Sequence, residues 1–327
     1  MENYKYRFDK ALLINRPYGL SAFIRLKNGA DTISFTIDSH IAIFDEIVIV
    51  LNGCTDNSLE ICESYKNMYP DLIKIYIYEP EVYPFGSKEH KKEPFDSIHS
   101  FVNFSNFALQ KTSFSHVMKL DDDHYCPISL QNKEMFLSGF DDDKVNYFSG
   151  VNLTWDSDGD VAINSDYPLA GNGDHFIIKL NENTYFKKND ICEYFSFDKL
   201  EFNYLGLRYF HLKYLRRNYG FSNVLNTVRG NSIKQSVEKS GNISIEQFID
   251  AASKLAIIKN NGDIHYLFRL YRGIKWIGLR KLILLVLAKN KKLAAIRGLM
   301  LSDNMVDIIN SESKESLTAR FGCLQSK

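Results

Sequence analysis

Residues 44–53 read FDEIVIVLNG, a stretch whose core, IVIVL, is apolar at five consecutive positions before the chain reaches Asn-Gly. A continuous β-branched run of this length is typical of a parallel strand that is buried on both faces. The residues that follow, CTDNSLEICESYKNMYP, begin with helix-capping types and keep apolar side chains at helical spacing until Pro70. The stretch therefore predicts one strand–helix unit of an α/β sheet.

Further strand and helix patterns on either side extend this unit. Strands are expected at residues 20–26, 72–80 and 116–120, and helices at 29–39 and 98–110. Residues 81–97 are rich in proline, glycine and charge, so we expect a loop there. Strands that alternate with helices imply a right-handed parallel layer.

The second half of the chain changes character twice. Short β runs at 146–155, 160–164 and 175–180 have no helices between them, which predicts a mixed or antiparallel extension of the sheet. From about residue 225 the pattern becomes helical and basic. We therefore expect an α/β domain over residues 1–225 and a helical C-terminal region over 226–327.

Charge is unevenly distributed in this chain of 327 residues. Its formal net charge is zero, and its 45% hydrophobic and 24% charged residues are ordinary for a soluble globular protein. Between Asp263 and Asp303, however, the chain carries nine lysines and arginines and no acid, which leaves about −9 on the remainder. This asymmetry suggests that the C-terminal part faces an anionic surface.

Residues 274–300, IKWIGLRKLILLVLAKNKKLAAIRGLM, combine a tryptophan, clustered aliphatic residues and flanking cations. Such a segment can lie in the headgroup plane of an anionic membrane, or it can pack its apolar residues into a core of its own. The apolar run at 282–288 is too short to span a bilayer. Nucleic acid is not expected as a partner, because no recognition module is present and the remaining surface is acidic.

The cysteines and the N-terminus indicate the compartment. Five scattered cysteines without metal-binding spacing favour a reducing environment. Residues 1–15 do not have the basic, apolar and small-residue regions of a secretory signal. We therefore expect an intracellular protein.

Residues 117–125, VMKLDDDHY, place three aspartates directly after an expected buried strand. Open α/β sheets bind their ligands at the carboxyl ends of the strands. Asp121 and Asp123 alternate, so they can point to one side and hold Mg²⁺ or Mn²⁺ through oxygen ligands, with a substrate diphosphate as a further ligand. The alternative is an acidic surface turn.

Four motifs occur in the order found in a known class of enzymes. EIVIVLNGCTDNS followed by HVMKLDDDH resembles the GT-A glycosyltransferases, and AFIRLKNGADTI with YFHLKYLRR resembles the bacterial lipooligosaccharide N-acetylgalactosaminyltransferases. The resemblance covers residues 20–217. It implies a Rossmann-like nucleotide-binding sheet with a mixed extension. It also implies metal-dependent transfer from a nucleotide-diphospho-sugar, most simply a UDP-sugar, to lipopolysaccharide, lipooligosaccharide or capsule.

The resemblance also implies roles for the acidic residues and a late histidine. Asp121 and Asp123 correspond to the pair that bridges the diphosphate through the metal, and Asp122 to a contact with the ribose or the sugar. His211, in YFHLKYLRR, corresponds to a histidine that completes the metal site in many such enzymes. Its alternative role is that of a core histidine flanked by aromatic residues.

Several residues near the first two strands are candidates for nucleotide binding. Asp56 matches the acidic residue of the early nucleotide loop, and it can equally cap the helix that follows. Leu51 and Asn52 stand where many relatives carry two aspartates, although Asn52 can still read a base edge. Arg25 and Lys27 follow the first strand and can meet phosphate or base, while Lys27 can also be solvated.

Inverting transfer requires a carboxylate that takes the proton of the acceptor hydroxyl. Asp174, in GNGDHFIIKL, precedes a strand, follows glycines that allow close substrate approach, and matches a Gly-Asp pair of the resembling family. Capping of the strand edge is its alternative role. Asp156, Asp158 and Asp160 in TWDSDGD are further candidates, but this stretch also has the composition of a hairpin turn.

Two other functions share some of these features. A sugar-1-phosphate nucleotidyltransferase has a similar sheet and acidic metal site, but its first strand opens into a Gly-rich basic loop that AFIRLKNGADT lacks. A catalytically inactive relative would bind glycan or lipid without turnover, and the intact aspartate pair argues against it. The leading prediction is a glycosyltransferase on the inner face of the cytoplasmic membrane.

Overall fold

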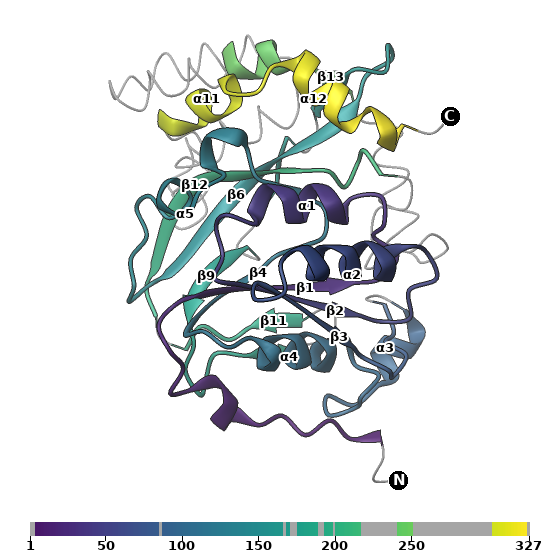
Figure 1. Ribbon diagram of the computed structural model, residues 1–327, viewed down its shortest axis with the longest axis vertical. Coiled ribbons are helices and arrows are strands. Elements are labelled where there is room, and N and C mark those ends of the chain that lie inside the picture. The colour runs from purple at the N-terminus through teal and green to yellow at the C-terminus, as the bar shows by residue number, and fades with distance from the viewer. Residues whose placement is uncertain are drawn as a thin grey trace.

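Eleven of the strands form one mixed sheet with helices on both of its faces, and β10 and β11 pair in a separate two-stranded sheet (Figure 1). The computed structural model describes residues 4–84, 87–165, 168–170, 175–188, 193–198, 200–216, 241–250 and 303–325. Its strands are β1 (Leu20–Leu26), β2 (Glu46–Leu51), β3 (Ile73–Ile77), β4 (His116–Lys119), β5 (His124–Tyr125), β6 (Val145–Trp155), β7 (Val161–Asn164), β8 (Leu169–Ala170), β9 (Phe176–Lys179), β10 (Phe186–Lys188), β11 (Glu193–Phe195), β12 (Phe202–His211) and β13 (Asn242–Ile243).

Helices connect the strands of the first half and close the chain. The α-helices are α1 (Ile33–His40), α2 (Ser58–Met68), α3 (Lys88–Lys92), α4 (Phe101–Lys111), α5 (Lys133–Phe136), α11 (Asp303–Asn310) and α12 (Lys314–Phe321), and the 3₁₀ helices are η2 (Lys10–Leu13), η3 (Ile128–Leu130) and η6 (Gly322–Leu324). The expected loop at 81–97 was wrong in one respect, because it contains α3. Ser87 caps that helix by accepting a hydrogen bond from the amide of His90 at 3.0 Å.

Strands β4, β1, β2 and β3 lie side by side in this order and run parallel. Side chains of β1 alternate between the two faces of the sheet. Ala22, Ile24 and Leu26 join the core beneath α1 and α2, while Phe23 joins the core against α4. The expected α/β class with a parallel layer is confirmed, and the carboxyl ends of β1, β2 and β4 lie along one edge.

The sheet continues beyond β4 as the expected mixed extension. Strand β9 pairs antiparallel with both β4 and β6, and β6 turns into β7 as a hairpin. Strand β12 pairs parallel with β6 and antiparallel with β5, the short strand that follows the three aspartates. This arrangement brings strands that are far apart in sequence next to the end of β4.

The described C-terminal residues pack on the same sheet. Strand β13 pairs with β7, so the region expected to be helical also contributes a short strand. The Glu312 carboxylate accepts a hydrogen bond from the amide of Ile128 at 2.9 Å, and the Thr318 hydroxyl accepts one from the amide of Val161 at 2.9 Å. The domain boundary at residue 225 stays a prediction.

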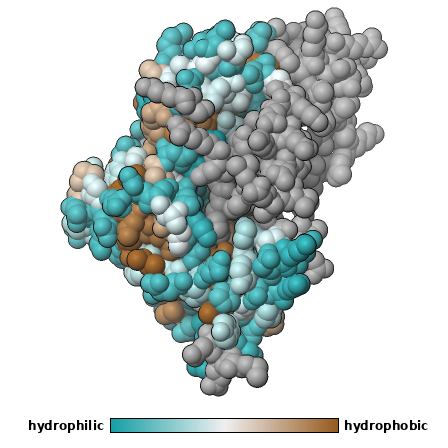
Figure 2. Space-filling view, turned by 90° about the vertical axis from the view of Figure 1, so that its right-hand side faces the viewer, coloured by the Kyte–Doolittle hydropathy of each residue, from teal (hydrophilic) through white to brown (hydrophobic). Residues whose placement is uncertain are grey.

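Hydrophilic residues cover most of the described surface seen in Figure 2, with smaller hydrophobic patches between them. None of the helices within the described residues has both the length and the hydropathy needed to cross a membrane. Residues 274–300, expected to contact either a membrane or an internal core, lie outside the described residues.

Candidate active site

Three consecutive carboxylates, those of Asp121, Asp122 and Asp123, follow β4 at the carboxyl edge of the sheet. We call these residues the acidic turn. Asp121 is the most exposed of the three side chains, at 32%. Its two oxygens lie 3.4 Å from the Lys119 ammonium and 3.8 Å from the Arg25 guanidinium. Both distances are ion-pair contacts rather than short hydrogen bonds.

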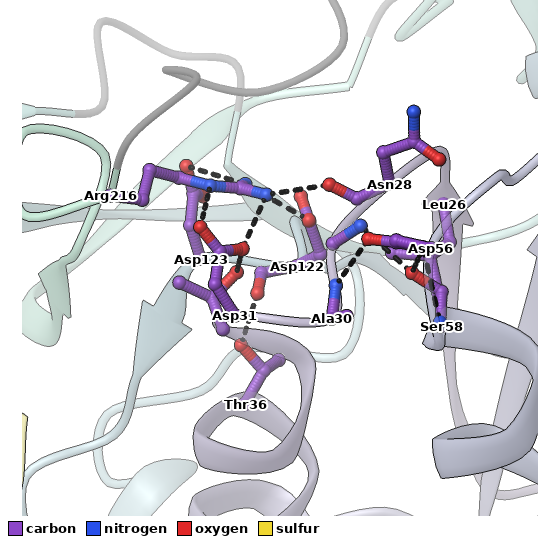
Figure 3. Close-up of polar contacts among 12 residues, drawn as sticks. Leu26, Asn28, Ala30, Asp31, Thr36, Asp56, Ser58, Asp122, Asp123 and Arg216 are labelled. Atoms are coloured by element: carbon purple, nitrogen blue, oxygen red, sulfur yellow. Dashed lines mark hydrogen bonds and ion pairs between the residues drawn. The ribbon is translucent and has the colours of Figure 1, made fainter. Parts of the chain in front are cut away.

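Asp122 points toward a buried arginine instead (Figure 3). Arg216 is fully buried, and its guanidinium lies 3.0 Å from Asp122 and 2.9 Å from Asp31. The backbone carbonyl of Asp122 accepts a hydrogen bond from the Thr36 hydroxyl at 2.8 Å. Gly29 leaves room for this arrangement, since a Cβ at that position would lie 2.3 Å from an Asp122 carboxylate oxygen.

Asp123 is paired with the late histidine that the sequence singled out. Its carboxylate lies 3.4 Å from Nε2 of His211 on β12. The other ring nitrogen of His211 lies 2.7 Å from the side-chain oxygen of Asn152, its neighbour on β6. Because that oxygen can only accept, Nδ1 donates to it, and this contact fixes Nε2 as the nitrogen that faces Asp123.

Two more histidines lie beside the acidic turn. His124 on β5 is opposite His211 in the register with β12, and its ring is fully buried and stacked on Tyr209. The ring of His175, which directly precedes β9, lies 4.4 Å from that of His124. Neither ring nitrogen of His124 has a hydrogen-bond partner among the described residues.

Two groups of described residues can hold a metal ion. In each group the potential ligand atoms lie within 4.8 Å of one another. Asp123, His124 and His211 form one group, and Asp121, His124 and His175 form the other. The two aspartates expected to share one ion thus fall into different groups, each with its own histidine besides His124.

The three carboxyl groups of the acidic turn have different pKa values. Burial and the neighbouring carboxylates raise the pKa of Asp122 to about 6, against the opposing effect of Arg216. Burial also acts to raise the pKa of Asp121 and of Asp123, but nearby cations and imidazoles outweigh it and keep both values well below the usual range. Burial together with His175 holds the pKa of His124 well below its usual value. The imidazole is therefore neutral, the form that ligates metals.

Arg25, a candidate for phosphate or base binding, is held between α4 and β11. Its guanidinium contacts the Ser105 hydroxyl, lies 2.5 Å from Glu193, and stacks over the Phe101 ring at 4.8 Å. Lys27 follows β1 on the same edge and is half-buried. Nucleotide binding by either residue stays a prediction.

Asn52 and Asp56 both have structural partners. The Asn52 amide donates to the carbonyls of Tyr78 and Pro80 at 2.8 and 2.7 Å, which joins the end of β2 to the segment after β3. Asp56 accepts from the amide of Ser58, the first residue of α2, at 3.1 Å, although Asn57 is the N-cap residue of that helix. Nucleotide binding by Asn52 and Asp56 stays a prediction.

The expected catalytic base, Asp174, lies outside the described residues. Its alternatives lie in the turn of the β6–β7 hairpin, as the composition predicted. There the Asp156 carboxylate accepts from the amides of Asp158 and Asp160, both at 2.9 Å. Asp160 also forms an ion pair with Lys314 at 2.6 Å. These contacts give the carboxylates of Asp156 and Asp160 a structural role.

The family model described as Beta-1,4-N-acetylgalactosaminyltransferase (CgtA) matches residues 3–275, most of the chain. The chain belongs to the CgtA family. This confirms the predicted glycosyltransferase family, and it argues against the nucleotidyltransferase alternative. No curated protein matches the chain.

Solved structures give weaker similarities to this CgtA-family chain. Glucosyl-3-phosphoglycerate synthase from Mycobacterium tuberculosis, in complex with UDP, is 17% identical with a TM-score of 0.28, over 43% of this chain and 47% of that one. S. aureus TarS is 12% identical with a TM-score of 0.36, over 86% and 55%. The chain thus spans about half the length of these proteins. Similarities this low support no inference about activity.

Sequence reasoning missed three residues of the CgtA-family site. His124 directly follows the three aspartates, His175 directly follows the expected base, and Arg216 lies in the YFHLKYLRR motif. An imidazole next to a carboxylate run is a signal for a metal site, and it was present at His124. Arg216 had no comparable signal, because its partner Asp31 is 185 residues away.

Proposed function

We propose that this chain transfers a sugar from a nucleotide-diphospho-sugar to a bacterial surface glycan, with inversion at the sugar C1. The observation that carries the proposal is the 3.4 Å pair of Asp123 and His211 at the carboxyl edge of the sheet, in a member of a glycosyltransferase family. The description of that family supports UDP-linked N-acetylgalactosamine as the donor.

The residues around Asp123 fit a divalent cation. Asp123 offers a carboxylate and His211 its Nε2, which Asn152 orients from the next strand. An imidazole in the ligand set suits Mn²⁺ better than Mg²⁺, so we propose Mn²⁺. When bound, the ion supplies positive charge that stabilises the departing diphosphate.

The transfer step then needs a base and a route for the leaving group. The acceptor hydroxyl oxygen forms a bond to the sugar C1 while the bond from C1 to the diphosphate oxygen breaks. The nucleoside diphosphate leaves with that electron pair, and the hydroxyl proton passes to a carboxylate, for which Asp174 remains our proposal. Lys27 is proposed to contact the donor phosphates from the end of β1.

A matched pair of variants tests the metal role of Asp123. Asp123→Asn should lower the rate of Mn²⁺-dependent transfer and donor hydrolysis by about 100-fold or more, because the metal supplies several kcal/mol of charge stabilisation. Asp143 is the last residue of a second Asp-Asp-Asp run and is exposed, so Asp143→Asn is the control. Equal rates in the two variants would refute the assignment.

The base is tested in the same assay. Asp174→Asn should abolish transfer while UDP-N-acetylgalactosamine still raises the melting temperature in the presence of Mn²⁺. Asp158→Asn, in the β6–β7 hairpin turn, should retain transfer. Near-normal turnover by Asp174→Asn would remove that residue from the role.

We further propose that the acceptor is lipid-linked and that the basic segment between Asp263 and Asp303 brings the protein to the inner face of the cytoplasmic membrane. Its nine cations support the proposal, since each basic residue near an anionic surface contributes about 1 kcal/mol. The full chain should sediment with phosphatidylglycerol vesicles at low salt and be released by high salt. Equal sedimentation with phosphatidylcholine vesicles would contradict the electrostatic attraction.

A further inference from the structure

We propose that Asp121, His124 and His175 form a second metal site, which binds a transition-metal ion such as Zn²⁺ independently of the Asp123–His211 pair. The inference goes beyond sugar transfer and needs no nucleotide-sugar. It assigns a role to two buried histidines that the proposed reaction leaves unused.

The three potential ligand atoms are already close together. They lie within 4.8 Å of one another. Around a tetrahedral Zn²⁺ with bonds of about 2.0–2.1 Å, ligand atoms lie about 3.4 Å apart, so small side-chain movements would close the site. The sheet explains the proximity. Met118 on β4 pairs with Ile177 on the antiparallel strand β9. Two residues further along the same register, His175 lies opposite Leu120, which is next to Asp121.

His124 supplies the independent observation that points to a ligand. Its side chain is 0% exposed, and within the described part of the chain neither ring nitrogen has a hydrogen-bond partner. Leaving a buried polar group unpaired costs about 1–3 kcal/mol, and bonding of a ring nitrogen to a metal ion would remove that cost. Stacking on Tyr209, with ring centroids 3.8 Å apart, fixes the plane of the imidazole.

Asp121 provides both charge and access. Its contacts with Lys119 at 3.4 Å and Arg25 at 3.8 Å are long, so its carboxylate oxygens remain available for a shorter bond to a metal. The side chain is also exposed enough to connect the site with solvent. Three protein ligands and one position open to water is the pattern of a reactive rather than a purely structural zinc site.

The ligand types determine the metal. Two imidazoles and one carboxylate suit Zn²⁺ and Co²⁺ and do not suit Mg²⁺, which prefers oxygen ligands. His124 is common to both groups of potential ligands, but Asp121 and His175 occur only in this one. Substitution of His175 therefore separates the proposed site from that of His211.

The test uses the full chain, stripped of metal with a chelator and then loaded with Zn²⁺ or Co²⁺ in the absence of nucleotide. Wild-type protein should retain one equivalent of Zn²⁺ through gel filtration and show visible Co²⁺ absorption. His175→Gln should lose both, with at least a tenfold weaker Co²⁺ affinity, whereas the matched control His211→Gln should keep both. Absence of retained metal in the wild type, or loss only in His211→Gln, would overturn the inference.

A measurement on wild-type protein removes the dependence on the folding of His175→Gln. X-ray absorption of the Zn²⁺-loaded wild type and of His211→Gln should both show two imidazoles and one oxygen ligand from the protein, because His211 belongs only to the other group. A shell without imidazoles, or the loss of one imidazole in His211→Gln, would refute the site. The two proposals also fail separately. Retained Zn²⁺ without sugar transfer would contradict only the proposed function, and Mn²⁺-dependent transfer without retained Zn²⁺ would contradict only this inference.

Discussion

Replacement of Arg216 by methionine tests how the acidic turn is held. The guanidinium is fully buried and is the cation that lies 2.9 Å from Asp31, 3.0 Å from Asp122 and 4.0 Å from Asp123. Methionine fills a similar volume without charge, so the variant leaves three carboxylates facing one another. Breaking a buried ion pair by removing one partner costs about 3–5 kcal/mol. Since Asp31 is 29% exposed and partly screened, we expect the lower end, about 3 kcal/mol.

The assay is urea unfolding of the metal-free protein, followed by tryptophan fluorescence and circular dichroism. Arg7→Met is the matched control, because Arg7 is exposed, and surface substitutions usually change stability by less than about 0.5 kcal/mol. Added Mn²⁺ should recover part of the stability lost in Arg216→Met, since a dication replaces the missing positive charge and stabilises the folded state by binding to it.

Two results would refute this reasoning. If Arg216→Met were as stable as Arg7→Met, the buried ion pairs would contribute nothing to folding. If Arg216→Met lost about 3 kcal/mol but Mn²⁺ restored none of it, the loss would come from packing, and the carboxylates would not be accessible to a metal.

Two further predictions concern single side chains. Burial lowers the pKa of His40 to about 4, so the unfolded chain binds a proton near pH 6.5 that the folded protein excludes. The stability that neutral His40 contributes is therefore fully present above pH 6.5 and is lost as the pH is lowered toward 4, by about 2 kcal/mol between pH 7 and 5. In His40→Gln, the urea midpoint should no longer show this pH dependence. Asn152→Leu removes the acceptor that orients His211 and should weaken Mn²⁺ binding, measured by electron paramagnetic resonance, by about 10–100-fold, while Asn152→Asp keeps an acceptor and should bind near normally.

The parallel part of the fold could be predicted because its signals are local. The apolar run in residues 44–53 became β2, Glu46–Leu51, and residues 20–26 became β1 with unchanged limits. Both strands are buried on the two faces of the sheet, so they lack the alternation of a half-exposed strand. The short helix α3 was missed because a five-residue segment, KEHKK, has no apolar face by which to recognise it.

The metal ligands could be predicted only in part, because their grouping depends on strand order. That Asp121 and Asp123 lie at a ligand-binding edge follows from their position after β4. His211 lies near Asp123 because β12 pairs with β5. His175 lies near Asp121 because β9 pairs with β4. Register between strands that are 50 or more residues apart depends on long-range packing, and one sequence does not specify it.

Three like charges can lie side by side in the acidic turn because each carboxylate has its own partner. Asp121 faces a lysine and an arginine, Asp122 is paired with Arg216, and Asp123 faces His211. The acidic turn is therefore compensated before any metal binds. A dication at Asp123 must compete with the arginine 4.0 Å away. We therefore expect the histidine ligands, rather than the number of carboxylates, to determine which metal binds.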